Sequence, residues 1–380
     1  MAPALGEPSI CAATPAAELM SGFLMGKAAR SRPSCGRWRH PPALALAPTR
    51  PGRAARLGIL RRMKHDAWRR QPENYPFSGE ILPRYTDVDL WQHLNNVALI
   101  SLQIESVQRL LLDVVGDAAW RAGPAAVGPE TTSTDFIAEA YYPTPLTAAA
   151  RITHVNERDI GIASALFQKG HCVGLHQSRV VSWAPDSQPV PMPAELRAAF
   201  ARRLAAQPPL PPGAEPEAGH QPALAHPGDA AGGAPADSMQ VLRRRPADFP
   251  AHYPLASRFG DHDATGRTSD QALGRMAEQG RVNLLTALMG PERLASPVGF
   301  MVAHVSLRWL RRGRAPAAWN AGSGVLRSGD RSITIRAQLS DGDDCHAVCD
   351  SVMVAIDREA RQSIRLPDDL RAAVDRLSVR

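Results

Sequence analysis

Apolar residues recur along residues 97–114 with the spacing of a helix. The positions, separated by three or four residues, are Val97, Ile100, Ile104, Val107, Leu111 and Val114. This spacing places all of them on one face. Gly116 follows where a glycine commonly caps a helix C-terminus, and Asn95 or Asn96 can supply the N-cap. We therefore predict a long helix with one buried face.

Beyond this helix, the pattern changes to short runs that alternate or are rich in strand-forming residues. In order, they are TDFIAEAYY, AAARITHV, IGIASALFQ and CVGLHQSRVVSW, and PAELRAAFARRL, from Pro193, then predicts a closing helix. The first part of the chain is thus expected to contain a strand, the long helix, four strands and a shorter helix.

The same order of predicted elements occurs a second time, 174 residues later. RYTDVD at 84–89 returns as RFGDHD at 258–263, and the offset also pairs Gly116 with Gly290 and Pro193 with Pro367. The second set of runs is VGFMVAHVSLRWL, AWNAGSGVLR, SITIRAQL and CHAVCDSVMVAI, closed by PDDLRAAVDRL. A constant offset over so many landmarks indicates two copies of one domain.

The segment between the copies has the composition of a linker. Residues 207–238 contain eight prolines and five glycines and no aromatic residue, which is typical of a semi-extended connection. We therefore divide the chain into an extension (1–62), a first domain (63–205), a linker (206–240) and a second domain (241–380).

Positive charge is concentrated in the extension. The formal charge of the chain is +7, but residues 1–62 hold ten Lys or Arg and only two Asp or Glu, so the rest is close to neutral. We expect the extension to be disordered, and Met63 is an alternative start of translation. A basic arm for nucleic acid stays an alternative, although aromatic residues are too few and scattered for a stacking surface.

Cysteine usage and hydropathy point to a reducing, aqueous compartment. The chain has five cysteines, an odd number without a Cys-x-x-Cys pair, which argues against a disulfide framework. We find no apolar run of about 18 residues, the length that a membrane span needs, and expect a cytoplasmic protein with no membrane partner. Cys345, His346 and Cys349 suggest zinc, but without a second ligand pair in the sequence a buried core position is favoured.

A helix with an apolar stripe beside an antiparallel sheet with one apolar face implies that the sheet wraps the helix. The linker is long enough for the two units to meet edge to edge. We therefore predict an α+β fold in which the two units pack as an intramolecular pseudo-dimer. Whether this pair assembles into a further homo-oligomer is left open.

Two motifs resemble a known enzyme family. DVDLWQHLNN at 87–96 is similar to the Asp-x-Asp-x-x-Gly-His-x-Asn-Asn signature of hotdog-fold thioesterases of the 4-hydroxybenzoyl-CoA thioesterase type. FGDHDATG at 259–266 resembles the corresponding loop of the aromatic-acyl branch. The resemblance covers nearly all of 80–200 and 255–375. It implies two tandem hotdog domains that act on thioesters of coenzyme A or acyl carrier protein, with active sites at their interface.

In this family the second Asp of the loop is catalytic, which maps onto Asp89 and Asp263. A carboxylate just ahead of a helix can attack a thioester or activate water while backbone N–H groups polarise the carbonyl. A thiol with a pKa of about 8.5 leaves without strong acid help, so no metal or organic cofactor is expected. The first Asp of each pair, Asp87 or Asp261, is interpreted as structural.

The copies differ around this carboxylate. The first unit has His93, Asn95 and Asn96 where the second has Arg267, Ser269 and Asp270, and the second keeps the family's glycine as Gly266 where the first has Gln92. His93 is a candidate to orient Asp89 or contact the thioester, Asn96 to hold the attacking water or cap the helix, and Asn95 to bind substrate. We expect the Asp89 site to be active, and the Asp263 site to be degenerate or to act on another part of the ligand.

The run RWLRRGR at 308–314 offers Arg311 and Arg312 as candidate ligands for the phosphates of coenzyme A, since arginine binds phosphate in a bidentate manner. A solvated hairpin turn is the favoured alternative.

The function predicted from the sequence is hydrolysis of an acyl thioester to free acid and thiol. A hotdog dehydratase is disfavoured because an Asp-x-x-x-x-His motif is not found. A non-catalytic module that binds acyl-CoA is the alternative from another class. The sequence does not identify the acyl group.

Overall fold

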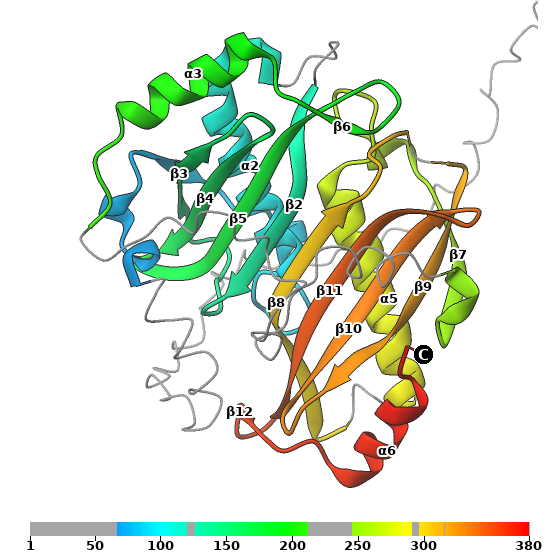
Figure 1. Ribbon diagram of the computed structural model, residues 1–380. Helices are drawn as coiled ribbons and strands as arrows, with labels where there is room; N and C mark the ends of the chain where they lie inside the picture. The colour runs from blue at the N-terminus through cyan, green and yellow to red at the C-terminus, as the bar shows by residue number, and fades with distance from the viewer. Residues whose placement is uncertain (1–66, 120–125, 212–244, 291–295, 315, 380) are drawn as a thin grey trace, which may run out of the picture. The chain divides into compact units, whose positions relative to one another are not determined.

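The computed structural model describes residues 67–119, 126–211, 245–290, 296–314 and 316–379 (Figure 1). The predicted extension, the alternative start at Met63 and most of the linker lie outside these residues. The first unit contains strand β1 (Phe77–Ile81), helix α2 (Asn96–Val115), strands β2 (Ala126–Phe136), β3 (Leu146–Val155), β4 (Asp159–Gln168) and β5 (His171–Trp183), the short β6 (Pro189–Val190) and helix α3 (Ala194–Ala205).

The second unit repeats this order. It contains β7 (Ala251–Ala256), α5 (Asp270–Met289), β8 (Val298–Trp309), β9 (Ala318–Ser328), β10 (Ser332–Asp341), β11 (Asp344–Asp357), β12 (Gln362–Ser363) and α6 (Asp368–Arg376). Helix α5 begins and ends 174 residues after α2, so the offset read from the sequence holds at both ends of the long helix.

The strands form one antiparallel sheet across both units. Its order is β1-β3-β4-β5-β2-β8-β11-β10-β9-β7, with β6 beside β5 and β12 beside β11. The units meet where β2 pairs with β8, with Thr132 opposite Leu307 and Ser133 opposite Ser306. At the end of this pairing, the Asp135 carboxylate lies 2.7 Å from His304 Nδ1. A sheet edge of each unit is thereby covered by the other, which satisfies backbone groups that would otherwise be exposed.

The long helix of the first unit buries the face that its sequence predicts. Val107, Leu110 and Leu111 pack with Ile152 and Ile160 of the sheet in one apolar cluster. The Asn95 side chain accepts a hydrogen bond from the Val97 N–H and forms the N-cap, and Gly116 has a φ of 60° at the C-cap. That φ favours glycine.

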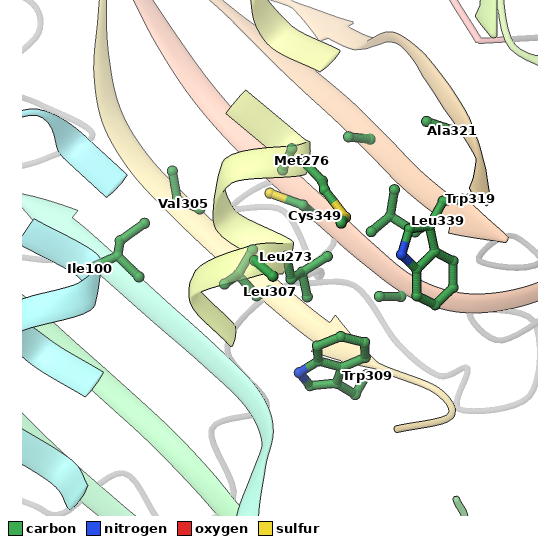
Figure 2. Close-up of a cluster of buried hydrophobic side chains, with 14 of the residues drawn as sticks. Ile100, Leu273, Met276, Val305, Leu307, Trp309, Trp319, Ala321, Leu339 and Cys349 are labelled. Atoms are coloured by element: carbon green, nitrogen blue, oxygen red, sulfur yellow. The ribbon is translucent and has the colours of Figure 1, made fainter. Parts of the chain in front are cut away.

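Helix α5 is built in the same way, with the Ser269 side chain accepting from Ala272 N and Gly290 at its end. Its buried residues Leu273 and Met276 pack with Trp309 and Trp319 of the second unit's sheet, and Ile100 of α2 joins this cluster (Figure 2). One continuous apolar cluster therefore contains side chains from both long helices.

The second-unit strands agree closely with their predicted runs, but β2 does not. We predicted a strand over TDFIAEAYY from Thr134, whereas β2 spans Ala126–Phe136 and ends well before Tyr142. Pro129 lies inside it, and the pairing of β2 with β5 shifts register between Pro129 and Thr131. A bulge accommodates the missing N–H of proline, and the Gly, Pro and Ser content hides this strand from pattern recognition.

The first residues assigned to the linker lie against the first unit. The Gln207 side chain donates to Ile152 O at 2.8 Å and accepts from Ile152 N at 2.9 Å, and Arg151 donates to Pro208 O. Gln207 thus continues the edge of the sheet beyond α3.

Cys345 and Cys349 are buried, as the favoured interpretation predicted. Among the helices of the described residues, none is long and apolar enough to cross a membrane.

Candidate active site

The first aspartate of each repeated hexamer stabilises its loop. Asp87 accepts a hydrogen bond from Arg84 N at 2.7 Å and pairs with the Arg84 guanidinium at 2.9 Å. Asp261 repeats both contacts with Arg258, at 2.8 and 3.0 Å. Both aspartates are buried. A buried carboxylate that caps a turn is expected to fix the loop backbone rather than react.

In the first unit, the second aspartate lies beside a histidine. Asp89 Oδ1 accepts from Trp91 N at 2.8 Å, and Oδ2 lies 3.4 Å from His93 Nδ1. The structure therefore brings together these two predicted residues.

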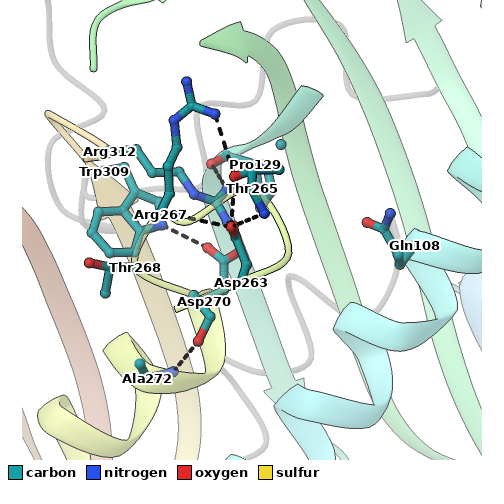
Figure 3. Close-up of polar contacts among 12 residues, drawn as sticks. Gln108, Pro129, Asp263, Thr265, Arg267, Thr268, Asp270, Ala272, Trp309 and Arg312 are labelled. Carbon is teal, nitrogen blue, oxygen red and sulfur yellow. Dashed lines mark hydrogen bonds and ion pairs between the residues drawn. The ribbon is translucent and has the colours of Figure 1, made fainter. Parts of the chain in front are cut away.

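In the second unit, the corresponding carboxylate is held by more donors. Asp263 Oδ1 accepts from Thr265 N at 2.8 Å, from Thr265 Oγ1 at 2.6 Å and from Arg267 N at 3.1 Å. Asp263 Oδ2 accepts from Arg312 Nη2 at 3.2 Å (Figure 3). About a quarter of the Asp263 side chain remains exposed.

Arg312 is buried, so the favoured interpretation of its segment as a solvated turn is wrong at this residue. Its Nη2 lies 2.9 Å from Asp270 Oδ2 as well as bonding Asp263. Trp309 Nε1 donates to Asp270 Oδ1 at 2.7 Å. Burial raises the pKa of Asp270, and the Arg312 charge opposes that rise. Arg311, in contrast, is partly exposed and pairs with the exposed Asp344.

A cavity of about 830 Å³ opens in front of Asp263. Its polar side is formed by the loop and start of α5, with Asp263, Thr265, Ser269, Asp270 and Gln271, together with Arg312. Its apolar side comes from the other unit, with Leu102, Ile104, Val107 and Leu111 of α2 and Val127 of β2. Figure 3 shows Gln108 of α2 across this space from Asp263. Both units therefore contribute to one cavity.

Near Asp89, at the equivalent place in the first unit, amide side chains contact charged side chains of α5. Asn95 and Asn96 donate to Glu278 Oε1 at 3.0 and 3.3 Å, and Arg281 Nη2 donates to Asn96 Oδ1 at 2.8 Å. Glu278 and Arg281 stand 174 residues after Ile104 and Val107. Apolar cavity-lining positions of α2 are thus occupied by an acid and a buried arginine in α5, and burial lowers the Arg281 pKa.

Sequence reasoning did not find the network of Asp270, Trp309 and Arg312. One sequence signal for this network was the acid Asp270 at the position where the first unit has Asn96. We interpreted this acid only as a helix cap. The depth at which Trp309 and Arg312 are buried depends on the packing of β8 against α5, which the local pattern does not reveal.

Comparison with known proteins supports the resemblance. Residues 257–374 match the family model described as the Thioesterase-like superfamily. The match covers about a third of the chain. The match spans the loop of Asp263, helix α5 and the strands of this thioesterase-like unit. No curated protein matches the chain.

Solved thioesterases share the fold of the two units together. The 12:0-ACP thioesterase from Umbellularia californica is 10% identical with a TM-score of 0.51, over 74% of this chain and 94% of that one. An acyl-ACP thioesterase from Bacteroides thetaiotaomicron is 9% identical with a TM-score of 0.50, over 73% and 97%. At these identities the likeness concerns the fold, an α+β hotdog architecture with a large antiparallel sheet.

Proposed function

We propose that the chain hydrolyses acyl thioesters and that Asp263 is the catalytic carboxylate. The observation that carries this proposal is the position of Asp263, in the loop just before α5. It faces a cavity whose opposite wall has aliphatic side chains of α2 beside polar ones such as Gln108. An acyl chain placed against α2 would bring its thioester group to this carboxylate. The family match, which includes the Asp263 loop, supports the same assignment.

The chemistry follows from the groups at the polar end. Asp263 either takes a proton from a water molecule that attacks the thioester carbonyl, or attacks that carbonyl itself to form a mixed anhydride that water then hydrolyses. The positive N-terminal end of α5, where Gln271 lines the cavity, would stabilise the negative charge that develops on the carbonyl oxygen. The C–S bond breaks, and the sulfur leaves as thiolate and gains a proton. The products are the free acid and the thiol.

The apolar wall favours a substrate with a hydrocarbon acyl group. Leu102, Ile104, Val107 and Leu111 offer branched aliphatic surface, which stabilises an acyl chain by about 0.8 kcal/mol for each buried CH₂ group. The thiol carrier is coenzyme A or acyl carrier protein, and acyl-ACP thioesterases with this fold make the carrier protein a substrate to include.

We further propose that the two units form a pseudo-dimer related by an approximate twofold axis between β2 and β8. The strand pairing supports this symmetry. A twofold axis exchanges each residue with its equivalent 174 positions away, which turns the pair Thr132–Leu307 into Ser133–Ser306. Both pairs occur in the structure. The pair 131/308 maps onto 134/305 in the same way. Such self-mapping is characteristic of an isologous interface.

Asp89 is the alternative catalyst, as the sequence suggested, because it lies beside His93. Glu278 and Arg281 weaken this alternative, since an acyl chain reaching Asp89 along α5 would meet these two charged side chains. Burying an acyl chain against them would cost part of their hydrogen bonding.

The test is thiol release from a panel of short, long, branched and aromatic acyl-CoAs and matching acyl carrier proteins. We expect Asp263→Asn to reduce kcat by about a hundredfold or more, the scale of a lost general base, with Asp89→Asn close to wild type. Loss of activity in Asp89→Asn alone would assign catalysis to the first unit. A folded wild type that binds acyl-CoA without turnover on any substrate would favour the non-catalytic binding module.

A further inference from the structure

Arg312 connects the proposed catalytic carboxylate to the buried interior. Its Nη2 bonds both Asp263 Oδ2, at 3.2 Å, and Asp270 Oδ2, at 2.9 Å. Its guanidinium carbon lies 5.7 Å from the centre of the Trp309 ring. Asp263 is the most exposed member of this group, because Asp270, Trp309 and Arg312 are each at most 5% exposed, although Asp270 and Arg312 also line the cavity.

The first unit supplies further contacts to this arginine. Arg312 Nη1 donates to Pro129 O at 3.2 Å, at the bulge of β2. Gly128, next to it, leaves the room that the guanidinium occupies, since a Cβ at this position would lie 2.6 Å from Arg312 Nη1. The backbone of Arg312 also contacts the first unit, because Arg312 N donates a hydrogen bond to Ser187 O.

The two carboxylate oxygens of Asp263 accept different numbers of hydrogen bonds. A carboxylate oxygen has two lone-pair sites. Oδ1 receives three donors from Thr265 and Arg267, whereas Oδ2 receives Arg312 alone among the contacts of the described residues. Oδ2 therefore keeps a lone pair that can accept a proton from water or attack a thioester carbon, as long as the carboxylate does not rotate.

We propose that Arg312 is a positioning residue that fixes the Asp263 carboxylate so that Oδ2 is its reactive oxygen, and that the first unit takes part through Gly128 and Pro129. The proposal rests on the function assigned to Asp263. It gives the buried arginine a role different from the phosphate binding for which the sequence made it a candidate, since both of its Nη atoms bond protein acceptors.

The experiment compares three variants with the wild-type chain. Arg312→Gln removes the charge, Arg312→Lys keeps a charge but cannot bridge two acceptors with a planar fork, and Gly128→Ala displaces the guanidinium without changing it. Gly79→Ala in β1 is the matched control, because a Cβ there meets no atom within 4 Å. Arg312→Gln combined with Asp270→Asn avoids leaving a buried unpaired carboxylate. Thermal unfolding shows which variants are folded.

We expect Arg312→Gln, its double variant and Gly128→Ala to lower kcat by about ten- to a hundredfold, the scale of a misplaced reacting group, with KM nearly unchanged. Arg312→Lys should recover part of kcat. A merely structural role would change stability without these effects.

Crystal structures of the folded variants provide a readout that is independent of turnover. A rotated Asp263 carboxylate in the double variant is the expected result, and an unmoved carboxylate would overturn the positioning role. Unchanged kcat in that variant, with Asp263→Asn inactive, would overturn it too while leaving the proposed function intact. A wild type without turnover whose Asp263 rotates in the variant would reject the proposed hydrolysis and leave the orienting contact established.

Discussion

Stability at mildly acidic pH should depend on His176. This histidine is fully buried on β5, where Nδ1 lies 2.8 Å from Thr134 Oγ1 and Nε2 lies 3.0 Å from Ser178 Oγ. Burial lowers its pKa from 6.5 to about 3, and the positive charge of Arg69 acts in the same direction. The folded protein therefore keeps His176 neutral where the unfolded chain binds a proton.

The sign and size of the pH dependence of stability follow from this difference in protonation. Above about pH 6.5, His176 is neutral in both states and does not contribute to the pH dependence. Below that value, each unit of pH costs about 1.4 kcal/mol of the free energy of unfolding until the folded pKa is reached. At pH 5 the loss is about 2 kcal/mol.

The perturbation that isolates this effect is His176→Gln, because glutamine offers a donor and an acceptor but does not titrate. Urea unfolding at pH 7, 6 and 5 measures the free energy of unfolding of both proteins, with His171→Gln as an exposed control. We expect the wild type to lose about 2 kcal/mol more than His176→Gln between pH 7 and pH 5. Equal losses in both proteins would show that His176 titrates normally in the folded state and would refute the reasoning.

Three other substitutions test the core and the cavity. Leu110→Ala, at a fully buried position of α2, should lower the free energy of unfolding by about 2–5 kcal/mol in urea denaturation. Ile104→Trp should fill part of the cavity and shift the preferred acyl-CoA to shorter chains in kcat/KM. Asp350→Asn should cost about 3–5 kcal/mol in the same denaturation assay, because it leaves the buried Arg336, now bonded at 2.7 and 2.8 Å, without its counter-charge.

Much of the fold could be predicted from the sequence because its signals are local. The apolar stripe of 97–114 and the caps at Asn95 and Gly116 define α2 at nearly its observed bounds. The hydrophobic period and the cap residues report directly on helix formation. The constant offset then transfers the prediction to α5, whose own stripe is weaker because Glu278 and Arg281 interrupt it.

The candidate site was less predictable because it depends on contacts between distant segments. His93, Asn95 and Asn96 made the first unit look better equipped, yet the cavity in the structure adjoins Asp263. Its apolar wall belongs to α2 of the other unit, and the loop motif contains no information about that wall. Likewise, Arg312 stands in a run rich in arginine that looks solvated, and its burial depends on contacts with Asp270 of α5 and Pro129 of the other unit.

The β2–β8 pairing within one polypeptide has a consequence for how the two halves can diverge. In a homodimer, any substitution on the long helix appears in both copies and alters both interfacial sites at once. Here the chain carries Ile104 and Val107 on one helix and Glu278 and Arg281 on the other. Covalent fusion therefore separates two tasks that symmetry would couple, since one face can be selected for ligand access while its counterpart is selected for adhesion between the halves.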